Sequence, residues 1–115
     1  MDNQVKKTMA SHIKMLRLMR GLTQQDVAQR LHKTTNAISN WELGNTSPPI
    51  DDMVELCKIY QVTPNQLCGW DECPELIEYI KTKENVSSKI EELQREKKEI
   101  ENRIKKYMTL LDRNN

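Results

Sequence analysis

The sequence predicts an all-α protein with five short helices followed by one long helix. Apolar residues recur every three or four positions in each segment, and no segment has the pattern of a strand. Thr, Gly and Pro divide the first 69 residues into short helical pieces. After Lys81 the repeat continues without Gly or Pro. We therefore expect a head at 1–69, a linker at 70–74 and a coiled-coil helix at 75–115.

Composition and charge limit the class of partner. Phe is absent and aromatic residues make up 4% of the 115 residues, so the core must consist of Leu, Ile, Val and Met. The net charge is +1, but residues 1–48 hold seven basic and three acidic side chains. Residues 71–78 hold four acidic side chains and no basic one. This asymmetry is compatible with a head that binds phosphate groups.

Cysteine and histidine usage gives no sign of a metal site or a cofactor. The three cysteines form no C-x-x-C pair, and two histidines provide no zinc-ligand spacing. There is no signal peptide and no apolar run long enough to span a bilayer, so we expect a cytoplasmic protein with reduced thiols. No catalytic cluster or Gly-rich phosphate loop is present, which argues against an enzyme.

Capping residues mark the first two helices. Gly21 is expected to end the first helix, and Thr23 begins the second with Asp26 as the acid of a capping box. The buried faces of the two helices are then Met9, Ile13 and Leu16, followed by Val27, Ala28 and Leu31.

The third helix is the candidate for reading DNA bases. Thr34 is its expected N-cap, and Ile38 and Trp41 turn to the core. Asn36 and Asn40 are one turn apart, and an Asn amide matches the N6 donor and N7 acceptor of adenine. A merely solvated polar face remains the alternative. The outer residues are Thr35, Asn36, Ser39 and Asn40.

Two further helices follow the Pro-rich break at 44–49. The fourth is predicted to bury Ile50, Met53, Cys57 and Tyr60. The fifth has a Thr cap, Pro at its first position and Gln at its third; it holds Leu67 and ends at Gly69.

A resemblance to a known family rests on motifs spread over all five helices. The segment I-x-x-L-R-x-x-x-G-L-T-Q (Ile13–Gln24) is followed by D-V-A-Q-R-L, A-I-S-N-W-E-L-G and V-T-P-N-Q-L-C-G. Together they resemble the Cro/C1-type (Xre-family) helix-turn-helix of phage repressors over about residues 5–69. The resemblance implies a lambda-repressor-like head whose third helix enters the major groove while the second lies across the backbone.

The resemblance also implies roles for individual residues. Thr35, Asn36 and Asn40 match base-reading positions, with Ser39 beside them. Arg17 and Glu42 match an ion pair that fixes the first helix against the third; two independent surface charges are the alternative. His32 departs from the usual Gly and would need a positive φ. The expected phosphate contacts are Gln24, Lys33, Thr34, Asn45, Thr46 and Ser47.

The long helix carries a heptad repeat that predicts a homodimeric coiled coil. Ile at position a with Leu at d favours two strands, and Lys83 and Lys97 at a disfavour larger bundles. Both orientations remain open; we favour a parallel pair because it puts both heads at one end. The predicted interface is Leu76, Tyr79, Val86, Ile90, Leu93, Ile100, Ile104, Tyr107 and Leu111.

These features predict a transcriptional regulator of phage or mobile-element repressor type that binds a pseudo-palindromic operator in double-stranded DNA as a dimer. Two other classes remain open: the antitoxin of a toxin–antitoxin pair, and an antirepressor that binds protein but no longer reads DNA. A neighbouring toxin gene would favour the antitoxin, and absence of salt-dependent DNA binding would favour the antirepressor.

Overall fold

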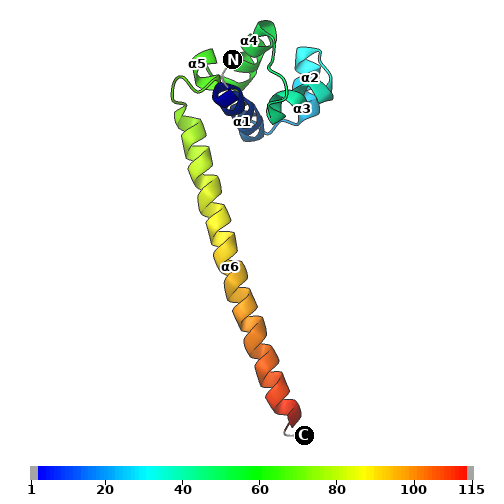
Figure 1. Ribbon diagram of the computed structural model, residues 1–115, viewed down its shortest axis with the longest axis vertical. Helices are drawn as coiled ribbons and strands as arrows, with labels where there is room; N and C mark the ends of the chain where they lie inside the picture. The colour runs from blue at the N-terminus through cyan, green and yellow to red at the C-terminus, as the bar shows by residue number, and fades with distance from the viewer. Residues whose placement is uncertain (1–2, 114–115) are drawn as a thin grey trace. The chain divides into compact units, whose positions relative to one another are not determined.

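The computed structural model describes residues 3–113, which form six helices and no strand. The short helices come first in the chain and the long helix follows them (Figure 1). The all-α fold expected from the sequence is confirmed. The helices are α1 (Asn3–Met19), α2 (Gln24–Leu31), α3 (Thr35–Leu43), α4 (Ile50–Tyr60), α5 (Pro64–Leu67) and α6 (Pro74–Arg113).

Local hydrogen bonds start the helices where the sequence predicts. The Thr23 hydroxyl accepts from the backbone N–H of Asp26 at 3.0 Å, and the Asp26 carboxylate accepts from the N–H of Thr23 at 2.9 Å. These bonds hold the pKa of Asp26 below its ordinary value. Thr63 and Gln66 form the same capping box on α5, and the Thr34 hydroxyl accepts from Ala37 N–H at 3.1 Å.

Left-handed residues follow each of the helices α1 to α4, including Gln61 after α4 with φ 59°. Gly21 follows α1 with φ 68°, and Gly44 ends α3 with φ 79°. His32, at the end of α2, has φ 54°, which is the positive value expected of a residue in place of the usual Gly. The turn between α2 and α3 is therefore only three residues long, from His32 to Thr34.

Helix α1 packs against α3, α4 and α5, and α2 packs against α3. The predicted core faces of α1, α2 and α3 are confirmed by burial. One expectation for α4 is wrong, because Ile50 is 75% exposed while Leu56 is fully buried. Ile50 is the first residue of α4, one turn before Met53, which is only half-buried. The buried core includes Met9, Ile13, Leu16, Val27, Ala28, Leu31, Ile38, Trp41, Leu56, Cys57, Tyr60 and Leu67.

The head extends beyond Gly69, since the chain divides into compact units at Met1–Tyr79 and Ile80–Asn115. The segment predicted as a linker is bonded to α5: the N–H of Trp70 donates to Asn65 O at 2.8 Å, and Gln66 Nε2 donates to Glu72 O at 3.1 Å. Leu76 is 3% exposed within this unit. Its assignment to the coiled-coil face is therefore wrong, because the head itself covers its side chain.

The second unit is the rest of α6, from Ile80 onward. Every described side chain from Lys81 to Arg113 is exposed. The apolar residues at heptad core positions there are 50–64% exposed in the single chain, and their pairing in a coiled coil stays a prediction. None of the described helices is both long and apolar enough to cross a membrane.

Candidate DNA-binding interface

The outward face of α3 is polar, and its orientation is fixed from behind. Ile38 is fully buried and Trp41 is 5% exposed, so these two side chains anchor the helix in the core. On the opposite side Thr35 and Asn36 are exposed, whereas Ser39 and Asn40 are half-buried. The structure thus gives Thr35 and Asn36 the greatest freedom to reach a base edge in a major groove.

Asn40 and the loop after α3 are linked. Asn45 Nδ2 donates to Asn40 Oδ1 at 3.2 Å, and the N–H of Asn45 donates to the Asn40 carbonyl at 3.0 Å. The Asn40 amide keeps its own Nδ2 donor and a second lone pair on Oδ1. The N–H of Thr46 donates to the same carbonyl at 3.4 Å. Asn40, which is predicted to contact a base, is therefore hydrogen-bonded to the loop that is predicted to contact phosphate.

Arg17 and Glu42 form a bidentate ion pair between α1 and α3. Arg17 Nε lies 2.7 Å from Glu42 Oε2, and Nη2 lies 3.0 Å from Oε1. The two side chains are 10% and 2% exposed. The hydrogen bonds to Glu42 raise the pKa of Arg17, against the opposing effect of burial. Arg17 Nη1 also donates to Leu22 O at 2.9 Å. The ion pair therefore connects α1 and α3 to the segment that precedes α2.

Glu42 has a second donor that the sequence does not reveal. Gln24 Nε2, at the first position of α2, donates to Glu42 Oε1 at 3.2 Å. Helices α1, α2 and α3 therefore all converge on this one carboxylate. Gln24 was expected to contact a phosphate, and of its side-chain atoms only the second amide N–H is left to do so, since the carbonyl oxygen is an acceptor.

The two residues before α3 have structural partners of their own. Lys33 Nζ lies 3.3 Å from Asp52 Oδ2, and the side chains are 41% and 11% exposed. Thr34 is the N-cap of α3. Lys33 would thus have to leave the largely buried carboxylate of Asp52 in order to reach a phosphate. Thr34 can keep its capping hydrogen bond to Ala37 while its exposed surface faces DNA.

A positive charge close to the loop after α3 was not predicted. Lys6 Nζ, from α1, donates to the carbonyl of Asn45 at 3.3 Å. Its ammonium group therefore lies beside the loop residues Asn45, Thr46 and Ser47 that were expected to contact the DNA backbone. Lys6 and Asn45 are 39 positions apart, so no spacing rule could join them.

Tyr60 lies behind the ion pair, at the end of α4. Its side chain is fully buried, and its hydroxyl has no hydrogen-bond partner among the described residues. Burial, with the nearby negative charge of Glu42, raises the pKa of this phenol. Tyr60 therefore stays neutral and fills the core behind the charged pair.

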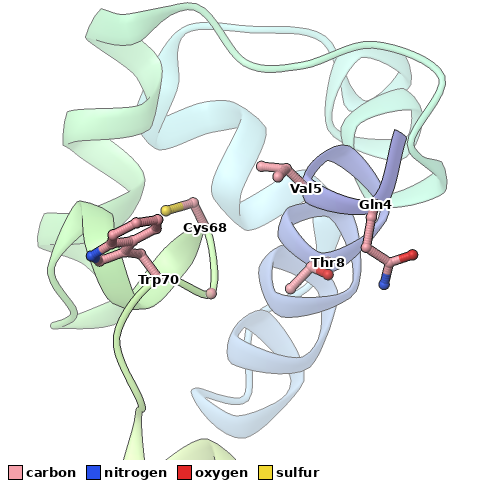
Figure 2. Close-up of a pocket in the computed structure, with 6 residues that line it drawn as sticks. Gln4, Val5, Thr8, Cys68 and Trp70 are labelled. Carbon is pink, nitrogen blue, oxygen red and sulfur yellow. The ribbon is translucent and has the colours of Figure 1, made fainter. Parts of the chain in front are cut away.

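A small apolar hollow lies elsewhere on the head. Figure 2 shows Val5 and Thr8 on α1 on the side that faces Cys68 and Trp70, and Gln4 also lines the hollow. Its volume is about 190 Å³. A Cβ on Gly69, which also lines the hollow, would lie 2.7 Å from Thr8 Cγ2, so Gly permits the close approach of the two walls. No residue of α3 lines the hollow, so it is separate from the candidate DNA face.

The arrangement of α2, a three-residue turn and α3 with an outward polar face is that of a helix-turn-helix. The helix-turn-helix family model matches residues 13–67. Residues 13–67 form an Xre-family helix-turn-helix domain. The match covers the entire ion-pair network and α3. It identifies the head as a DNA-binding domain of the kind found in transcriptional regulators.

A search of curated proteins found a relative with a similar domain. The chain is 28% identical over 89 residues to the HTH-type transcriptional regulator ImmR of Bacillus subtilis (strain 168). The aligned region covers 77% of this chain and 70% of that protein. No solved structure matches the chain.

Proposed function

We propose that this protein is a transcriptional repressor of phage or mobile-element type that binds a pseudo-palindromic operator as a homodimer. In this proposal α3 reads bases in the major groove, and α6 pairs with α6 of a second copy as a parallel coiled coil. The named relative, an HTH-type transcriptional regulator, supports a role in transcription.

The observation that carries the DNA-binding part is the convergence of three helices on Glu42. Arg17 holds the carboxylate from α1 and Gln24 holds it from α2, so α3 has one orientation relative to the rest of the head. A fixed helix presents its side chains to base edges in a reproducible register. Asn36 is the exposed amide on that face and Asn40 follows one turn later.

Contacts to the DNA backbone are expected on either side of α3. Thr34, at its start, and Asn45, Thr46 and Ser47, after its end, supply hydroxyl, amide and backbone donors. Lys6 adds a positive charge at the loop. Because Asp52 offsets the charge of Lys33, we expect the positive charge of the loop side to contribute more to phosphate binding than that of Lys33.

Pairing through α6 is supported by the exposure of its heptad core. Val86, Ile90 and Leu93 are each at least half exposed in the single chain, in a helix that is otherwise strongly charged. A second copy would remove these side chains from water. A parallel pair would put two heads at one end, where they could bind half-sites about 34 Å apart on one face of the duplex.

The first experiment is selection of bound sequences from random double-stranded DNA at a stated salt concentration. We expect an inverted repeat whose half-sites are related by two-fold symmetry. Placed over a promoter, this site should lower reporter expression when the protein is present. Enrichment of no sequence would contradict the proposal, and a rise in reporter expression would contradict the repressor part alone.

Asn36→Ala tests the base-reading role. Loss of a two-point amide contact should cost about 1–3 kcal/mol at one or two operator positions and relax specificity there. Asn102→Ala, which removes an exposed Asn from the long helix, is the matched control and should leave the selected sequence unchanged. If Asn36→Ala weakened all sequences equally, Asn36 would be a positioning residue and not a base reader.

A further inference from the structure

The two halves of the long helix differ at their core positions. Between residues 83 and 97 the core includes the charged side chains Lys83 and Lys97. From Ile100 to Leu111 every core position is apolar. A bundle of more than two strands would bring several ammonium groups together around Lys83 or Lys97, which is costly. The second half is free of that restriction.

The flanking positions e and g change in the same place. From Ser87 to Arg103 they are all polar or charged: Ser87, Lys89, Gln94, Glu96, Glu101 and Arg103. They then become Met108 and Leu110, which are 61% and 45% exposed. A two-stranded coil covers positions a and d and leaves e and g at its rim. Met108 and Leu110 would therefore remain partly in water after dimerisation.

Core composition shows the same division. Ile90 at a with Leu93 at d is the combination that favours two strands. Ile100 at d with Ile104 at a is a combination that shifts the preference to more strands. The apolar face thus widens after residue 100 in a way that suits a four-helix contact.

A simple register brings the widened faces of two dimers together. In antiparallel helices position a faces d, while e faces e and g faces g. If Leu111 faces Tyr107 of an antiparallel neighbour, the same register places Met108 against Met108 and Leu110 against Leu110. Both extra apolar residues then pair with their own copies.

We propose that residues 104–111 join two dimers tail to tail into a tetramer through a four-helix contact, so that one particle carries two pairs of DNA-binding heads. The partner is a second dimer of this same chain. The inference rests on the proposed coiled-coil dimer, because the widened face is defined by what a pair of helices leaves uncovered. Such a tetramer would bring two operators together.

The test is sedimentation of the full chain over a wide concentration range, with two variants. Met108→Glu combined with Leu110→Lys restores polar rim positions. In a parallel pair the new acid faces Arg103 of the partner, so the dimer should not weaken. Leu93→Lys instead puts a charge in the dimer core and should reduce the dimer itself.

We expect the wild type to pass from dimer to tetramer with rising concentration, the Met108/Leu110 variant to stay a dimer, and Leu93→Lys to shift toward monomer. A wild type that stays dimeric at every concentration would overturn the tetramer. A tetramer that survives in the Met108/Leu110 variant would overturn the proposed contact between the tails. Both results would leave the proposed dimer intact. A wild type that stays monomeric would overturn both the dimer and the tetramer.

Discussion

The head and the long helix differ in the burial of their apolar side chains. Within the head Ile13, Leu56 and Leu67 are fully buried, whereas Ile90 and Leu93 in the long helix are 50% exposed in the single chain. The head therefore contains the partners it needs for its own core. The helix beyond Tyr79 does not, so its fold and its assembly should be linked in a way that those of the head are not.

Charged groups show the same contrast. Arg17 and Glu42 are largely buried and hold several hydrogen bonds each, so removing either one leaves the other without compensation. In the long helix the ion pairs are exposed and join neighbours on one helix, such as Lys89 with Glu92 at 3.4 Å. Exposed pairs of this kind contribute little to stability. Substitutions in the head should thus be costly, and matched substitutions in the tail nearly silent.

The largest effect on stability is expected at the buried pair. Arg17→Met or Glu42→Leu alone should lower the free energy of unfolding by about 3–5 kcal/mol, since each leaves an uncompensated buried charge. The double variant should recover much of that loss. Urea unfolding of the four proteins measures the coupling. Additive single effects would show that the pair does not act as a unit.

Matched leucine truncations test whether the two regions depend on different contacts for their stability. Leu76→Ala should destabilise the head by about 2–5 kcal/mol, because the side chain is 3% exposed inside it. Leu93→Ala should leave head stability unchanged and weaken association. Both tryptophans, Trp41 and Trp70, lie in the head, so fluorescence-detected unfolding reports on that region. Equal losses of head stability in the two variants would contradict the division at Tyr79.

The smallest effect concerns the capping box of α2. The lowered pKa of Asp26 means that its charged form stabilises the fold at pH above its ordinary value of 3.8, and that this contribution is lost as pH falls through the folded-state pKa. Asp26→Asn should therefore lower stability near neutral pH and converge with the wild type in acid. Asp112→Asn, outside any N-terminal cap, is the control. If the difference in stability between Asp26→Asn and the wild type stayed the same at low pH, this role of the Asp26 carboxylate would be contradicted.

Local features of the fold could be predicted because their causes are local. The caps at Thr23, Thr34 and Thr63 each depend on residues within three positions, and the helical spacing of Ile13 and Leu16 indicates their burial directly. Leu76 could not be placed, because its spacing suits both a heptad and the head core. Ile50, the first residue of α4, shows the same ambiguity, because periodicity predicts the buried face of a helix but not the residue at which burial begins.

The candidate site was predicted to the extent that its residues follow the family motif. That motif names Arg17, Glu42 and the outer face of α3, and the structure brings the first two into contact. The bonds from Gln24 to Glu42, from Lys33 to Asp52 and from Lys6 to Asn45 arise from tertiary packing and have no sequence signature. Gln24 and Lys33 thus have partners within the head, and their contacts with phosphate stay a prediction.

The most direct test of the proposed dimeric binding is truncation after Tyr79, with mass measured by sedimentation and affinity by titration of the selected operator. We expect a folded monomer, because residues 70–79 that complete the head are retained. Its affinity should fall by a factor of about 10²–10⁴, since the second head no longer benefits from being joined to the first. A truncated head that stayed dimeric and bound the operator as tightly as the full chain would contradict the account.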